Sequence, residues 1–132
     1  MAILTEAMKQ MIATQQCFIG TVSPDGIPNV APKRSTRVFN DETLIFNEGT
    51  GRHTYSNLTT GSKVAIAVVD REIMDGYRFV GTATLHQSGP VYEAAAAVSV
   101  QQGRPAPKAV VTVAVEEIYS LKPGPTAGTQ IA

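Results

Sequence analysis

Residues 44–58 read LIFNEGTGRHTYSNL, and the pattern passes from a strand through a glycine turn into the start of a helix. Residues 44–46 end a predicted strand, Gly49 and Gly51 free the backbone, and Arg52 opens a predicted short helix. Proteins commonly hold a phosphate in this way, because glycine lets main-chain N–H groups turn toward one point and the first helical N–H groups have no internal partner. The pattern by itself is weak, since most such loops only join a strand to a helix.

Length and composition place the chain among compact globular proteins. It has 132 residues, 43% hydrophobic and 17% charged, which suits one domain over residues 1–132 and is too short for two. Eleven basic residues balance eleven acidic ones, so no overall field recruits nucleic acid or an acidic membrane. A local excess of positive charge gathers around the glycine turn, in Lys33, Arg34, Arg37, Arg52 and Lys63.

Disulfide-linked, metal-binding and membrane proteins are not expected. The single cysteine, Cys17, allows no internal disulfide and no cysteine-based zinc site. No run approaches the roughly 20 apolar residues that cross a bilayer, and the N-terminal residues lack the pattern of a signal peptide. We therefore expect a cytoplasmic protein without a metal or a membrane partner.

The rest of the chain predicts short helices between strands. An amphipathic helix follows Thr5, a suitable N-cap, and Gly89-Pro90 begins the last of three helices. The predicted strands cover residues 16–23, 27–39, 43–47, 64–69, 77–87 and 109–121. Mostly antiparallel strands in so short a chain either expose two edges or close up, and closure is the usual solution. A small six-stranded barrel is therefore the expected fold.

Three local signals refine this expectation. The strand over residues 27–39 contains Pro28 and Pro32, which lack a ladder donor, so it should border a gap or carry a bulge there. Beside a gap, its free backbone groups could be offered to a ligand. The run VAIAVV at residues 64–69 is typical of a strand that is buried on both faces. Gly81 is a candidate bend where a closed sheet must curve.

Four segments together resemble the flavin-binding split barrels related to pyridoxamine 5'-phosphate oxidase. They are PDGIPNVAPK at residues 24–33, TGRHTYSNL at 50–58, the strand at 63–70 and EIYSLKPG at 117–124. Their order and spacing carry the resemblance, which extends over residues 16–128. It implies a mainly β fold with short α-helices, a six-stranded antiparallel split β-barrel of the FMN-binding type. It also implies a homodimer with each FMN in a cleft between the subunits.

The resemblance further implies which residues contact the flavin. The phosphate would be held by Gly51, Arg52, His53 and Thr54. The isoalloxazine ring would be lined by Asn29, Val30, Ala31, Pro32, Lys33 and Arg34. Asn57 matches a position where the family often has asparagine. Lys33 and Arg34 point to opposite faces of a regular strand, so only one of them should reach the flavin, where its charge would stabilise the anionic reduced form.

The activity that the resemblance implies is a redox reaction. Pyridoxamine 5'-phosphate oxidase has a longer C-terminal region with an arginine and a histidine that hold its substrate, and residues 126–131 offer neither. We therefore expect an FMN-dependent oxidoreductase or a small electron carrier, with NAD(P)H or another small molecule as its redox partner, and not oxidation of pyridoxamine phosphate. No catalytic residue is assigned, because hydride transfer at a flavin needs positioning above all.

Other ligands and roles stay open on the sequence alone. The same barrel could bind a deazaflavin coenzyme, whose long anionic tail would need a broader basic groove. It could also bind haem, for which only His53 and His86 are available as axial ligands. A third alternative is a protein that binds FMN without catalysis. Hydrolases and metalloenzymes are not expected, because two histidines and scattered acids assemble no catalytic triad or metal cluster.

Overall fold

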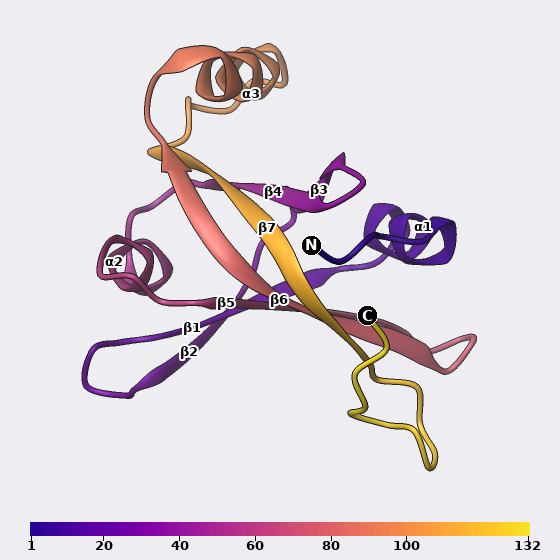
Figure 1. Ribbon diagram of the computed structural model, residues 1–132. Helices are drawn as coiled ribbons and strands as arrows, with labels where there is room; N and C mark the ends of the chain where they lie inside the picture. The colour runs from indigo at the N-terminus through magenta and orange to yellow at the C-terminus, as the bar shows by residue number, and fades with distance from the viewer.

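The computed structural model describes all 132 residues and shows a mainly β protein with three short helices. Seven antiparallel strands form one curved sheet in the order β2-β1-β5-β6-β7-β4-β3 (Figure 1). The predicted fold class is confirmed. None of the helices is long and apolar enough to span a membrane. The elements are α1 (Glu6–Thr14), β1 (Cys17–Val22), β2 (Pro28–Pro32), β3 (Arg37–Asn40), β4 (Thr43–Glu48), α2 (His53–Thr59), β5 (Val64–Asp70), β6 (Asp75–His86), α3 (Gly89–Gln101) and β7 (Ala109–Ser120).

The strand predicted over residues 27–39 is broken into β2 and β3, so the sheet has seven strands and not six. After Pro32 ends β2, the Thr36 N–H and hydroxyl both donate to the Lys33 carbonyl, at 3.1 and 2.7 Å, and turn the chain. β2 and β3 are the two edges of the sheet. We call the seam the place where residues 33–36, at the end of the β2 edge, meet the end of β4 and the glycine turn that follows it. The segment was predicted to border a gap or to carry a bulge, and the structure shows a break between two edges of the sheet.

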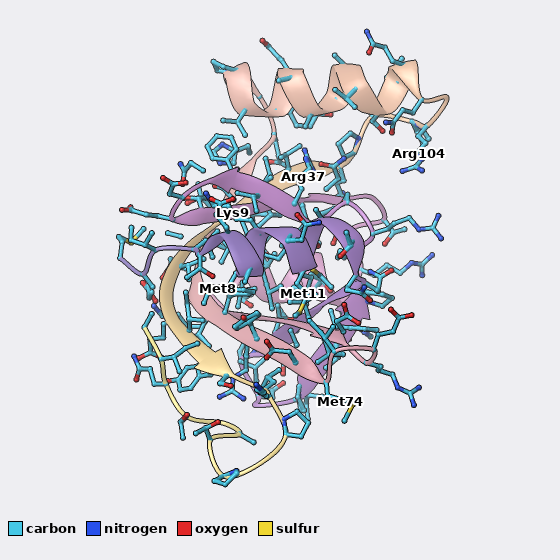
Figure 2. All side chains as sticks on the ribbon, turned by 90° about the vertical axis from the view of Figure 1, so that its right-hand side faces the viewer. Met8, Lys9, Met11, Arg37, Met74 and Arg104 are labelled. Atoms are coloured by element: carbon cyan, nitrogen blue, oxygen red, sulfur yellow. The ribbon has the colours of Figure 1, made fainter.

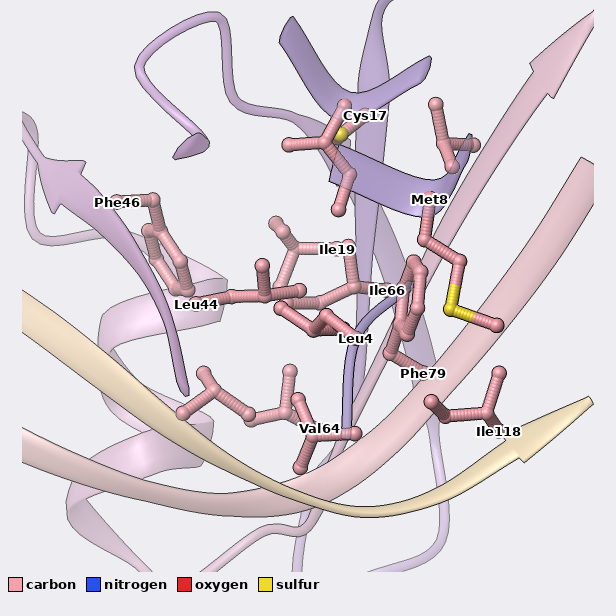
Figure 3. Packing of buried hydrophobic residues seen from close by; sticks show 14 of the residues in the cluster. Leu4, Met8, Cys17, Ile19, Leu44, Phe46, Val64, Ile66, Phe79 and Ile118 are labelled. Carbon is pink, nitrogen blue, oxygen red and sulfur yellow. The ribbon is translucent and has the colours of Figure 1, made fainter. Parts of the chain in front are cut away.

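The main hydrophobic core lies inside the curve of the sheet (Figure 3). Along β5 every second side chain points inward, so Val64, Ile66 and Val68 are buried. Ile66 pairs with Phe79 on β6, which is also fully buried. Burying a side chain of this size stabilises a fold by roughly 1.5–3 kcal/mol. The alternation of inward and outward side chains along the strand therefore decides which of its residues meet the core.

α1 closes one end of this core. Its buried face carries Met8, Met11 and Ile12, which recur at helical spacing. The Thr5 hydroxyl accepts the Met8 N–H at 3.3 Å, so the predicted N-cap is confirmed. The helix thus buries one apolar stripe and leaves its polar side in solvent.

The outer face of the sheet is apolar and uncovered where β2, β1 and β5 lie side by side. Strand register directs Phe18, Val22, Val30 and Val69 to this face, and they are between 41% and 69% exposed. The prediction that residues 64–69 are buried on both faces is therefore wrong for the single chain. An apolar run predicts that both faces need cover, and it does not say whether the same chain provides it.

β6 is a long strand that bends at Gly81. Its pairing with β7 shifts register between Val80 and Gly81. A Cβ atom at position 81 would collide with the carbonyl group of Ala114 on β7. The predicted bend is confirmed, and glycine is required there because two backbones approach each other closely.

Candidate functional site

A buried ion pair joins the two sides of the seam. Glu48 is the last residue of β4 and is completely buried. Its Oε1 atom lies 2.8 Å from Nζ of Lys33, whose side chain is only 16% exposed. This contact is ionic and lacks the direction of a hydrogen bond. The Oε2 atom accepts the Gly51 N–H at 3.0 Å, so one carboxylate ties the end of β2 to the glycine turn.

Glu48 was missed by the sequence analysis, and it changes the role of Gly51. The N–H that was expected to face a phosphate is already donated to a carboxylate of the chain itself. The sequence did contain a signal, an acid at the end of an apolar strand within a basic stretch. An exposed acid that merely begins a turn gives the same pattern, and acids are rarely fully buried. Only the fold separates the two cases.

Lys108 closes over the glycine turn and was also missed. Gly51 has a left-handed backbone with φ of 73°. A Cβ atom built on it would lie 2.5 Å from Cδ and 3.4 Å from Nζ of Lys108. The lysine ammonium also lies 5.0 Å from the centre of the Tyr55 ring. Register explains this placement, because Ala109, the residue after Lys108, pairs with Glu48.

The glycine turn also carries basic side chains that no acid of the chain neutralises. Lys108, Arg52 and His53 are exposed and take part in none of the four ion pairs of the structure. Arg52 is the N-cap residue of α2, and its side chain makes no capping hydrogen bond. Lys33, by contrast, is neutralised by Glu48. The free positive charge lies at the turn and not at Lys33.

Three of the predicted site residues hold α2 in place. The Asn29 amide donates to the Thr54 hydroxyl at 3.2 Å, which connects β2 with α2. The Asn57 amide donates to the Thr21 hydroxyl at 3.0 Å, which connects α2 with β1. Thr54 and Asn57 are buried, so these contacts fix the helix behind the turn. The asparagine at position 57 thus has a structural partner inside the chain.

The remaining predicted residues lie along β2 and the start of the seam. Val30, Pro32 and Arg34 are exposed, and Ala31 is half-buried. β2 pairs only with β1, so its outer edge has free backbone groups. Lys33 turns inward to Glu48 while Arg34 stays exposed, which agrees with the expectation that the two basic side chains separate.

A cleft of about 710 Å³ separates α3 from β3 and β4, and Arg34 forms part of its wall. Arg37 and Arg104 also line it, with apolar residues of α3 opposite, and Figure 2 shows Arg37 beneath the helix and Arg104 at its far end. The Arg37 guanidinium donates to the Ser35 carbonyl at 2.7 Å, and burial lowers the Arg37 pKa. No acidic residue lines the cleft. It suits an organic anion with an apolar body.

The two histidines differ in their surroundings. His53 is exposed at the first position of α2. His86 is half-buried near the end of β6, and its Nε2 atom lies 2.8 Å from the Thr112 hydroxyl. His86 is therefore engaged within the sheet, and His53 is the histidine that a ligand could reach.

Comparison with known proteins places this arrangement in a family. The sequence matches the family described as Pyridoxamine 5'-phosphate oxidase over residues 4–122. The chain belongs to the pyridoxamine 5'-phosphate oxidase family. The structure of HupZ from group A Streptococcus is 44% identical, with a TM-score of 0.86 over 96% of this chain and 100% of that chain. An uncharacterized protein of Methanocaldococcus jannaschii is 34% identical over 133 residues, covering 98% of this chain and 88% of that protein.

The fold recurs in more distant proteins. An FMN-binding protein of Syntrophomonas wolfei is 19% identical, with a TM-score of 0.72 over 88% of this chain and 84% of that chain. In this member of the pyridoxamine 5'-phosphate oxidase family, the structure brings together the two segments that were predicted to contact a cofactor. They are adjacent across the seam, joined by the contacts of Lys33 with Glu48 and of Asn29 with Thr54.

Proposed function

We propose that this chain is an FMN-binding flavoprotein of its family, acting as an oxidoreductase or small electron carrier in a homodimer. The observation that carries the proposal is the seam, where an open strand edge lies beside a turn with free cations. FMN combines a flat ring with polar edges and a doubly charged phosphate. The edge of β2 offers backbone groups to the ring, and the turn offers positive charge to the phosphate. The residues present therefore fit FMN.

At the phosphate, the proposed ligands are Arg52 and Lys108, with His53 adding charge when it is protonated. Gly51 contributes the shape of the turn, since its N–H is donated to Glu48. The Thr54 hydroxyl accepts from Asn29 and keeps its own proton for a phosphate oxygen. In this proposal side-chain cations, and not the Gly51 N–H, supply the main attraction for the phosphate, because that N–H is donated to Glu48.

At the ring, the proposed surface runs from Asn29 to Arg34, along β2 and into the start of the seam. When bound, FMN supplies the hydride and electron transfer chemistry. The chain holds and orients the ring through the free edge of β2. Arg34 is the basic residue here with no ion-pair partner, while Lys33 is neutralised by Glu48. Arg34 would therefore stabilise the anionic reduced ring and raise its potential.

The proposed homodimer rests on the uncovered outer face of β2, β1 and β5. Phe18, Val22, Val30 and Val69 form a contiguous apolar area on this face. Soluble single chains rarely expose such an area, and a second copy would cover it. Val30 belongs both to this area and to the proposed ring surface, so a partner subunit there would lie next to the flavin.

Purified protein tests the proposal directly. We expect it to show the visible absorbance of bound flavin, or to acquire it when FMN is added. A protein that neither carries flavin nor takes up FMN would reject the proposal. Mixing the FMN-loaded protein with NADH or NADPH without oxygen then separates the two roles. Rapid bleaching indicates a reductase, and no reaction indicates a carrier or a sensor.

One observation favours a second candidate, a deazaflavin coenzyme in the same barrel. The cleft beneath α3 carries Arg34, Arg37 and Arg104 and no acidic residue, as an anionic tail would require. Titrating the protein with FMN and with a deazaflavin coenzyme in parallel distinguishes the candidates. Tighter binding of the deazaflavin, lost in Arg104→Ala, would favour the second. In the FMN hypothesis the same cleft would receive the small-molecule redox partner.

A further inference from the structure

The buried carboxylate of Glu48 is not among the proposed ligands of FMN, although it contacts both halves of the proposed site. Its side chain is 1% exposed, and its two oxygens are engaged separately, by the Lys33 ammonium at 2.8 Å and the Gly51 N–H at 3.0 Å. The Lys33 side chain is 16% exposed. A full negative charge and a full positive charge therefore lie directly behind the turn.

The electrostatic effect of such a pair depends on its balance. Intact, the pair is close to neutral toward a ligand at the turn. A carboxylate without the lysine would repel a phosphate dianion, and a lysine without the carboxylate would attract it. Burial makes either imbalance strong, because water screens little of a charge that it does not reach.

We propose that Glu48 is a specificity-determining residue of the turn. By neutralising Lys33 and accepting the Gly51 N–H, it sets how strongly the turn prefers a flavin with a phosphate over the same ring without one. The inference rests on the proposed function, since it assumes that the turn receives the phosphate of FMN. Glu48 and Lys33 are paired with each other and are not proposed as ligands of the phosphate, so both act through the charge that they present to the turn.

The proposal predicts opposite effects for the two partners. The ratio of the riboflavin to the FMN dissociation constant measures the preference for phosphate. Glu48→Gln leaves Lys33 uncompensated and should raise this ratio about tenfold. Lys33→Met leaves the carboxylate uncompensated and should lower it about tenfold. The double variant removes both charges and should return the ratio to within about twofold of the native value.

The experiment titrates the full chain and each variant with FMN and with riboflavin, following flavin fluorescence. Glu116→Gln is the matched control, because it breaks the surface pair with Lys63, which also has a 2.8 Å separation. Glu116 lies seven residues beyond Ala109 on β7, which is roughly 23 Å from the turn along the strand. Its ratio should stay at the native value.

The outcomes separate this inference from the proposed function. A native protein that binds neither flavin rejects the proposed function. A native protein that binds FMN, with unchanged ratios in Glu48→Gln and Lys33→Met, overturns the role of Glu48, because a merely structural residue would weaken both flavins equally. Should one single variant not fold, the other gives the answer, because each should shift the ratio in its own direction and an unchanged ratio overturns the inference. In the double variant, which buries no unpaired charge, a tenfold fall shows that Lys33 itself attracts the phosphate and also overturns the inference.

Discussion

Two lysine–glutamate pairs in this protein have the same 2.8 Å separation and very different surroundings. In the seam, Lys33 and Glu48 are 16% and 1% exposed. On the surface, Lys63 and Glu116 are 64% and 40% exposed, and the Lys63 ammonium and the Thr82 hydroxyl lower the Glu116 pKa. Distance alone would rank the two pairs as equal. Solvent makes the surface pair weak and the loss of one buried partner costly.

Lys33→Met should give the largest effect, because it leaves the Glu48 carboxylate buried without a partner. The free energy of unfolding should fall by about 3–5 kcal/mol. Urea denaturation measures it, and Lys63→Met is the matched control, with an expected loss below about 1 kcal/mol. Adding Glu48→Gln to Lys33→Met should restore most of the loss. If Lys33→Met and Lys63→Met lost the same free energy of unfolding, burial would not distinguish the two ion pairs.

Cys17 extends the comparison to a buried ionisable group without any partner. Burial raises the pKa of its thiol to about 11, above the ordinary value near 9. As pH rises past 9 the unfolded chain therefore loses this proton first. The thiol's contribution to the free energy of unfolding should fall by about 2–3 kcal/mol by pH 11. Chemical denaturation of native protein and Cys17→Val at pH 8 to 11 measures the difference, and parallel curves would contradict the expected shift.

Arg52 represents the opposite situation, an exposed cation without an acid beside it. Arg52→Ala should weaken FMN binding by about 1.5–3 kcal/mol, through loss of a charged contact with the phosphate. Riboflavin binding should not change, because riboflavin has no phosphate. Arg71→Ala, in the hairpin between β5 and β6, is the control for the loss of an exposed arginine. An unchanged FMN dissociation constant in Arg52→Ala would exclude Arg52 from the site.

The smallest expected effect is a difference in stability between alanine variants of two glycines that have similar backbone conformations. Gly26 and Gly51 have φ of 82° and 73°. A Cβ atom at Gly26 meets nothing within 4 Å, whereas one at Gly51 meets the Lys108 side chain. Both alanine variants should lose about 1 kcal/mol through the left-handed backbone. Gly51→Ala should lose about 1 kcal/mol more as Lys108 is displaced. Equal denaturation midpoints would show that Lys108 moves freely.

Much of the fold was predictable because it follows from local patterns. The presence of strand β5, the Thr5 cap and the bend at Gly81 each depend on a few neighbouring residues. The break between β2 and β3 was not predicted. Pro28 and Pro32 indicated an irregular strand, but the change of sheet edge at Lys33 depends on which distant strands β2 and β3 pair with.

The candidate site was likewise predictable in part. The turn around Gly51 and the segment from Asn29 to Arg34 were predictable as separate stretches. Their partners were not, since Lys108 reaches the turn only through the pairing of Ala109 with Glu48. The arginine cleft likewise combines Arg34 and Arg37 with Arg104 from beyond α3. Such groupings depend on contacts between residues far apart in the chain.

The sequence by itself determined the family, the mainly β fold and the two stretches that border the seam, because hydrophobic period, proline and glycine act over short distances. The tertiary structure alone decided that Glu48 is buried, that it neutralises Lys33 and that the Gly51 N–H is occupied. The physical reason is that the effect of a charge depends on the solvent and the partners around it. Those surroundings form only when β2 and β4 come together at the seam.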